Sequence, residues 1–387
     1  MELLKLAKKT YPIFKKPTAH CIISTKKELH GWYPGKRECT SERLLINPYN
    51  GCSVGCFYCY ARALPGYFEI FHKQNIIFVA NEFDRRVGEQ LDSLNVASCG
   101  YLSPVSDPFQ ELENVYKLSK KITVEFIKRN IPIEFITKCK IPPDVIELIK
   151  QQRHSFVQVS ILTVHDKLRR IFSPFGADTQ TLFDNLKRAS KERIHTVLRI
   201  DPIFPFITDK KADLEILIKK AVDCGANHIV ASILDIPLRI YNWVLLSIKK
   251  KFGFQIYSSY RRLYCERIGY INARIDYRKA IFEFLRKISD KNKISFALCM
   301  EYELKEGKIL GLNREFMSSY NCEGINIPIY VRKGDKFFPW GNCFGNCLNC
   351  KDALCGIEEL AMAKDQNSKK AFTLKDYRRW SQIYFKF

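Results

Sequence analysis

The feature that most constrains this chain is a loop of three closely spaced cysteines that follows a short apolar segment. Residues 47–62 read Asn-Pro-Tyr-Asn-Gly-Cys-Ser-Val-Gly-Cys-Phe-Tyr-Cys-Tyr-Ala-Arg, which places Cys52, Cys56 and Cys59 at Cys-x3-Cys-x2-Cys spacing. Thiolates are soft ligands that select iron–sulfur or zinc sites. A structural zinc ion takes four ligands, and this loop supplies three. The spacing therefore favours a 4Fe–4S cluster with three protein-bound irons and a fourth iron left open for a small molecule.

The segments after this loop alternate short β-branched runs with longer amphipathic stretches. We expect strands at 44–47, 76–80, 100–103, 133–137, 156–162, 195–201, 228–233 and 294–299, and helices at 113–129, 144–152, 178–194 and 210–223. Such alternation is typical of an α/β fold with a parallel sheet. The pattern alone leaves open a doubly wound sheet and a full or partial barrel.

The cysteine loop, with Tyr58 just before its last cysteine, resembles that of the radical S-adenosylmethionine (SAM) enzymes. The wider string resembles the spore photoproduct lyase-like, or DNA repair photolyase-like, branch, and the resemblance extends over residues 43–235. It implies a partial (β/α) TIM-like barrel of the radical SAM type, with the cluster at its C-terminal mouth. It also implies lyase-like chemistry, in which reductive cleavage of SAM gives a 5′-deoxyadenosyl radical that abstracts hydrogen from a substrate.

Several residues at predicted strand ends gain meaning only from this resemblance. Taken alone, a Ser-Asp-Pro string is an ordinary turn, and single strand-end residues are usually solvated or satisfied in the core. The resemblance implies that Ser106, Asp107 and Lys138 hold SAM. Further candidates for cofactor binding are Tyr58, Ser160 and Arg199. Arg199 could face a carboxylate of the ligand, and pairing with Asp201 is an equally good structural interpretation.

One position departs from the branch. Spore photoproduct lyases carry a cysteine hydrogen donor shortly before the matching Ser-Asp region. In this chain Pro104 and Val105 precede Ser106, and Cys99 lies a strand-length upstream. The departure favours a member of the family with chemistry other than repair of the spore thymine lesion.

A second cysteine cluster lies near the C-terminus. Its spacing is Cys-x3-Cys-x2-Cys-x4-Cys, formed by Cys343, Cys347, Cys350 and Cys355. Four thiolates make a closed site, and we expect an auxiliary 4Fe–4S cluster there. Structural zinc is the alternative, although zinc sites usually use two separated Cys-x2-Cys pairs. Unligated thiols, or Cys299 or Cys322 in place of Cys355, also remain open.

The charge balance points to a polyanionic partner. The 387 residues contain 63 Lys and Arg against 41 Asp and Glu, a formal net charge of +22. We divide the chain into a basic N-terminal arm (1–42), a radical SAM partial barrel (43–300) and a cysteine-rich C-terminal extension (301–387). The stretch from Lys249 to Lys279 mixes cations with tyrosines, which suits either nucleic acid or a solvated basic face.

The distribution of apolar residues also predicts where the protein is located. The first ten residues have no apolar run of signal-peptide length, and the most apolar later stretch is interrupted by Asp235 and Arg239. We expect a cytoplasmic enzyme without a membrane partner, served by an electron donor such as ferredoxin or flavodoxin. The first hypothesis for its substrate is a nucleic acid. The alternatives are modification of a peptide or protein, and a non-catalytic iron–sulfur electron carrier or binding module.

Overall fold

A sheet of seven parallel strands forms the centre of the computed structural model, which describes residues 2–31, 44–345, 350 and 373–380. From one edge to the other, the strands are β15 (Ser295–Leu298), β12 (His228–Ile233), β11 (His195–Ile203), β10 (Phe156–Ser160), β9 (Ile133–Thr137), β8 (Gly100–Leu102) and β4 (Leu44–Ile46). The order begins at β15 and ends at β4, so the sheet is open. Because every neighbouring pair is parallel, all carboxyl ends lie at one edge, where α/β folds place ligands.

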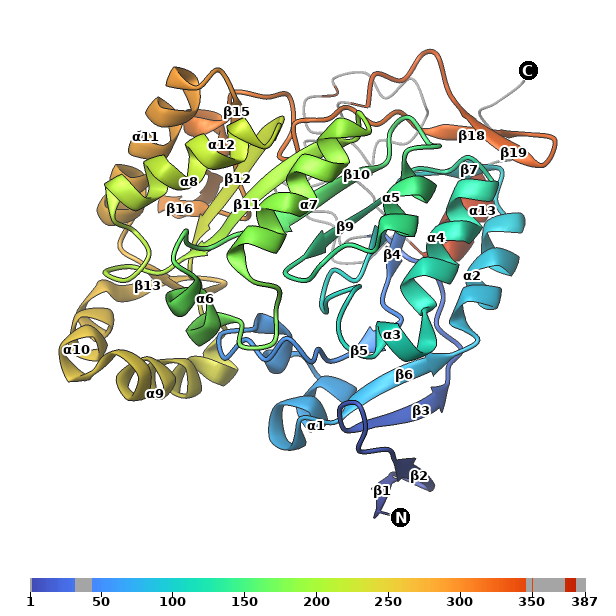
Figure 1. The fold of residues 1–387 in the computed structure, drawn as a ribbon, viewed down its shortest axis with the longest axis horizontal. Helices are drawn as coiled ribbons and strands as arrows, with labels where there is room; N and C mark the ends of the chain where they lie inside the picture. Colours follow the sequence, from blue (N-terminus) through green and yellow to red (C-terminus); the bar gives the residue numbers. More distant parts are fainter. Residues whose placement is uncertain (1, 32–43, 346–349, 351–372, 381–387) are drawn as a thin grey trace.

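Helices cover the outer face of this sheet (Figure 1). They are α4 (Leu118–Lys128), α5 (Pro143–Ile149), α7 (Thr179–Lys191), α8 (Lys211–Asp223) and α11 (Ile275–Lys291). On α7, Leu182, Leu186 and Ala189 recur at helical spacing and are buried. A parallel sheet coated by such helices is the partial α/β barrel expected from the sequence.

The remaining helices lie between or outside these units. They are α1 (Tyr67–Gln74), α2 (Phe83–Asp92), α3 (Glu113–Tyr116), α6 (Asp166–Phe172), α9 (Tyr241–Phe252), α10 (Phe254–Leu263), α12 (Asn313–Phe316) and α13 (Leu374–Trp380), with 3-10 turns η1 (Tyr60–Ala63) and η2 (Leu238–Ile240). None of the helices among the described residues is long and apolar enough to cross a bilayer.

Small sheets complete the fold. They pair β1 (Glu2–Leu6) with β2 (Lys9–Ile13), β13 (Tyr264–Ile268) with β14 (Tyr270–Ala273), and β16 (Tyr302–Lys305) with β17 (Lys308–Gly311). Two three-stranded sheets are β3 (His20–Ser24), β6 (Ile77–Asn81) and β5 (Tyr49–Asn50), and β19 (Lys336–Pro339), β18 (Tyr330–Lys333) and β7 (Val96–Ala97).

Two elements differ from the sequence expectation. The strand expected at 76–80 lies outside the barrel, because β6 pairs in parallel with β3 from the N-terminal segment. The helix expected at 113–129 is interrupted at Lys117, whose φ of 51° ends α3 before α4 begins. Both differences depend on pairings and backbone angles that local periodicity does not encode.

Residues Cys322 and Glu323 lie across the amino end of the barrel. The ring nitrogens of His195 and His228, at the starts of β11 and β12, lie 3.0 and 3.2 Å from the carbonyl oxygens of Glu323 and Cys322. The Gln158 side chain also donates to Glu323 at 3.3 Å. The opposite, carboxyl end is the end at which parallel α/β folds bind their ligands.

Candidate active site at the barrel mouth

The three-cysteine loop leaves β5 and ends in η1, and a buried glutamine fixes its shape. The Gln110 side chain accepts a hydrogen bond from the Ser53 amide at 3.0 Å and donates to the Gly51 carbonyl at 3.2 Å. Gly51 has a φ of +111°, and a Cβ there would come within 2.8 Å of the Phe71 ring. Only glycine fits this turn without strain, and the two hydrogen bonds of Gln110 support the loop in this conformation.

The thiols of Cys52, Cys56 and Cys59 are free and partly buried in this loop. Burial raises the pKa of Cys52, and the nearby charges of Asp107 and Cys56 raise it further. The Cys56 sulfur lies 3.3 Å from the Ser173 hydroxyl. Among the described residues, no three Cys, His, Asp or Glu side chains converge as ligands of a single metal ion. Three separate thiols in one rigid loop suit a cluster, in which each thiolate binds its own iron.

Asp107 joins two of the strand-end loops. Its carboxylate accepts hydrogen bonds from the Lys138 amide at 2.7 Å, the Thr137 hydroxyl at 2.8 Å and the Phe109 amide at 3.0 Å. Burial raises the pKa of Asp107, and these donors oppose the rise. The carboxylate is thus hydrogen-bonded to three donors of the protein itself, and its bond to the Lys138 amide fixes the backbone at that residue.

Two serines at the mouth have unused hydroxyls. The side-chain oxygens of Ser106 and Ser160 are buried and have no hydrogen-bond partner among the residues that the structure describes. A buried hydroxyl without a partner costs free energy, on the order of 1–3 kcal/mol. These two groups are therefore fit to hydrogen-bond a polar ligand at the mouth.

Arg199 lies on the inner face of the sheet beside Ser160, its partner in the β10–β11 register. It donates to the Gln158 side chain at 2.9 Å and to the Cys299 sulfur at 3.0 Å, and it forms an ion pair with Asp201. The pairing with Asp201, left open by the sequence, is confirmed. These three contacts all go to protein groups, so Arg199 links neighbouring strands inside the barrel.

Tyr58 packs under the cysteine loop. Its ring contacts Phe204 edge-on with centroids 4.9 Å apart and also meets Phe57 and Phe172. Burial raises the pKa of Tyr58, and the charge of neighbouring Cys56 adds to this effect. The tyrosine anchors the loop to the aromatic core.

Sequence reasoning missed several residues at the mouth. Gln110 lies two residues after the Ser-Asp-Pro string, and nothing in the sequence marked it as a functional residue. Ser232, on β12, donates to Asp201 at 2.6 Å. Cys299, which was named above only as an alternative ligand of the second cluster, follows the last residue of β15 and lies against Arg199. Tyr60, next to the last cysteine, is 38% exposed, and its hydroxyl donates to the Pro104 carbonyl at 2.6 Å. Only the fold brings these distant positions together.

The second cysteine cluster is partly outside the described residues. Cys347 and Cys355 lie outside them, so the predicted auxiliary site stays a prediction. The Cys343 sulfur accepts from the Ile329 amide at 3.4 Å, and Cys350 is partly buried.

An open parallel barrel with a three-thiol loop at its mouth defines a class of enzyme, and comparison with known proteins names that class. Residues 46–219 match the model of the Radical SAM superfamily. This segment is a radical SAM domain. The family implies a 4Fe–4S cluster and SAM, and the free thiols and unpartnered hydroxyls described above fit both groups.

Relatives extend over most of the chain. A radical SAM Nalpha-GlyT isomerase of Pseudomonas phage M6 is 26% identical over 373 residues, covering 89% of this chain and 76% of the phage protein. An uncharacterized protein of Methanocaldococcus jannaschii is 26% identical over 43% of this chain and 62% of its own length. Spore photoproduct lyase complexed with dinucleoside spore photoproduct has the same fold, with a TM-score of 0.55 at 12% identity, over 72% of this chain and 81% of that one. A mutant of the same lyase with bound AdoMet gives a TM-score of 0.56.

Proposed function

We propose that this enzyme cleaves SAM reductively and abstracts hydrogen from a nucleic-acid substrate carrying a damaged or modified base. The observation that carries the proposal is the fold shared with a lyase complexed with a dinucleoside photoproduct over 72% of this chain. The net charge of +22 supports a polyanionic substrate.

The residues at the mouth take distinct roles in this proposal. Cys52, Cys56 and Cys59 would bind the cluster, which supplies the electron for SAM cleavage when both groups are bound. The hydroxyls of Ser106 and Ser160 would hydrogen-bond SAM. Asp107, Lys138 and Arg199 would shape the mouth. Asp107 fixes the Lys138 backbone, and Arg199 holds Asp201 and Cys299 in place.

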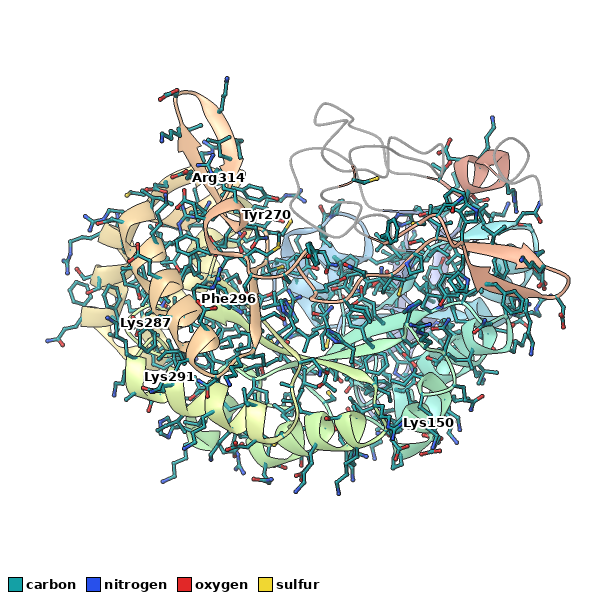
Figure 2. All side chains as sticks on the ribbon, turned by 90° about the horizontal axis from the view of Figure 1, so that it is seen from above. Lys150, Tyr270, Lys287, Lys291, Phe296 and Arg314 are labelled. Carbon is teal, nitrogen blue, oxygen red and sulfur yellow. The ribbon has the colours of Figure 1, made fainter. Side chains whose placement is uncertain are left out.

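The hairpin β13–β14 offers a surface that suits a nucleic acid beside this mouth. Its Arg267 side chain is exposed, and Tyr270 lies close to Tyr60 of the cysteine loop. Partial burial raises the pKa of Tyr60, and the neighbouring Cys59 and Tyr270 add to the rise, so the phenol stays neutral. Figure 2 places Tyr270 well inside the outline of the molecule. Tyrosines near an arginine can stack bases and pair phosphates.

A second candidate is isomerisation of the substrate. It is favoured by the phage isomerase, which aligns with 89% of this chain. An isomerase would rearrange a single nucleotide and return the hydrogen to it, whereas a repair lyase would break the bond between two joined bases. Both reactions leave the mass of the intact oligonucleotide unchanged, so digestion to nucleosides is needed: a lyase releases two separate nucleosides from one joined pair, and an isomerase converts one nucleoside into another of the same mass.

The experiment uses anaerobic, reconstituted protein with SAM and dithionite. DNA and RNA oligonucleotides, with and without photolesions or modified pyrimidines, are compared with a peptide library. We expect nucleic acid to stimulate 5′-deoxyadenosine formation, and deuterium from a deuterated oligonucleotide to appear in that product. Stimulation by peptides alone would contradict the proposal.

A further inference from the structure

Helix α9 lies directly on the cysteine loop. The Trp243 indole donates to the Phe57 carbonyl at 3.0 Å, and the Lys251 ammonium lies 5.4 Å from the Phe57 ring centroid. Phe57 is the residue after Cys56. Figure 1 shows α9 and α10 as a pair of helices beside the segment between β5 and α1. A partner docked on α9 would therefore be close to the site expected to hold the cluster.

The exposed side of α9 combines an apolar centre with cations. Trp243, Leu246 and Lys250 recur at helical spacing on one face, and the exposed fractions of Trp243 and Leu246 are 45% and 58%. Lys249 and Lys251 flank Lys250 and are exposed. We call these five residues the α9 face. Such a combination is typical of small, transient protein interfaces steered by charge.

The sign of the charge selects the partner. Residues 241–263, which form α9 and α10, contain five Lys and Arg residues and no Asp or Glu. The ammonium group of Lys249 lies 5.6 and 5.7 Å from the ring centroids of Tyr257 and Phe254, which join α9 to α10. An acidic protein partner complements this surface.

From the contact with the cysteine loop and the uniform positive charge, we propose that the α9 face docks an acidic one-electron carrier protein. In the step that follows, one electron leaves the carrier, which is oxidised, and enters the cluster, which is reduced. A carrier docked over Trp243 would lie beside Phe57, the residue after Cys56. The inference rests on the reductive chemistry proposed above but not on the identity of the substrate.

Charge reversal on the α9 face tests the proposal, with an acidic flavodoxin as the probe. The test variant is Lys249→Glu/Lys250→Glu. The control is Lys187→Glu/Lys287→Glu, which makes the same charge change on exposed positions of α7 and α11. Figure 2 shows Lys287 toward the periphery of the molecule, away from Tyr270.

The first readout is binding of flavodoxin to the metal-free chain, which does not depend on turnover. We expect the test variant to bind about tenfold more weakly than wild type at low salt, and the difference to shrink as salt screens the charges. The control should change the affinity by less than about twofold.

The second readout compares reductants in reconstituted protein. Reduced flavodoxin should drive 5′-deoxyadenosine formation about tenfold more slowly in the test variant, whereas dithionite, a small reductant, should drive it at the wild-type rate. Equal losses in test and control variants would overturn the proposal, as would unchanged flavodoxin binding. Weaker oligonucleotide binding with unchanged flavodoxin binding would also overturn it, and would assign the face to nucleic acid. None of these failures affects the dithionite-driven test of the proposed function.

Discussion

Single side chains decide whether the mouth of the barrel is preformed. Gln110 is fully buried and bridges the Ser53 amide and the Gly51 carbonyl of the cysteine loop. Gln110→Ala would leave both backbone groups without their partner. We expect the free energy of unfolding to fall by about 1–3 kcal/mol and the iron content after reconstitution to drop. Urea denaturation and an iron assay measure both. Gln151→Ala, at an exposed glutamine, is the control and should leave both values unchanged.

A partly buried carboxyl gives the protein a pH-dependent stability. Burial raises the pKa of Asp235 to about 8, with Glu301 and Asp201 adding to the effect. In the unfolded chain this group ionises near pH 4, so folding takes up a proton between about pH 4 and pH 8. The free energy of unfolding therefore falls as the pH rises through this window.

Asp235→Asn removes the proton uptake. The stability gained by this variant over wild type should grow by about 1–3 kcal/mol between about pH 5 and pH 8.5. Urea denaturation at the two pH values measures the gain. An unchanged difference would show that Asp235 ionises normally in the folded protein. Asp335→Asn, at an exposed position, is the control, and its difference in stability from wild type should be the same at both pH values.

At the scale of elements, the closure of the barrel depends on a segment far away in sequence. Gly324, in the segment across the amino end, has a φ of +68°, and a Cβ there would come within 2.4 Å of the His228 ring. Gly334, in the turn between β18 and β19, has a similar φ of +64° with nothing within 4 Å. The two glycines share a left-handed backbone that would strain any residue with a Cβ, and the surroundings of that Cβ differ between them.

Substitution of each glycine by alanine separates the free-energy cost of the left-handed backbone from the cost of the close packing. Gly334→Ala should lower the free energy of unfolding by about 1 kcal/mol, the cost of the left-handed backbone. Gly324→Ala should cost about 1–3 kcal/mol more, because the His228 ring must also move. Thermal and urea denaturation of both variants measure the difference. Equal losses would mean that the closing segment can shift away from β12.

At the scale of the whole molecule, local pattern predicted the strands that carry the site. The bounds of β9 and β12 agree with the sequence expectation, because buried parallel strands read as β-branched runs. The three cysteines could be singled out because they lie close together in one short stretch of the sequence. Ser106, Asp107 and Lys138 were noticed only through resemblance.

What pattern could not predict is long-range. The pairing of β3 with β6 and the closure of the barrel by residues 321–323 join segments far apart in the chain. Arg199 reaches Cys299 across 100 residues, and Trp243 reaches Phe57 across 186. Such contacts depend on the topology, which periodicity leaves open.

We propose above that the loop of Cys52, Cys56 and Cys59 binds the cluster that activates SAM. Its most direct test is 5′-deoxyadenosine formation by anaerobically reconstituted protein with SAM, dithionite and the stimulating oligonucleotide, compared with Cys56→Ser. Cys265→Ser, at an exposed cysteine outside the loop, is the control. We expect product from wild type and from the control, and none from Cys56→Ser. Product from Cys56→Ser at the wild-type rate would contradict the proposal.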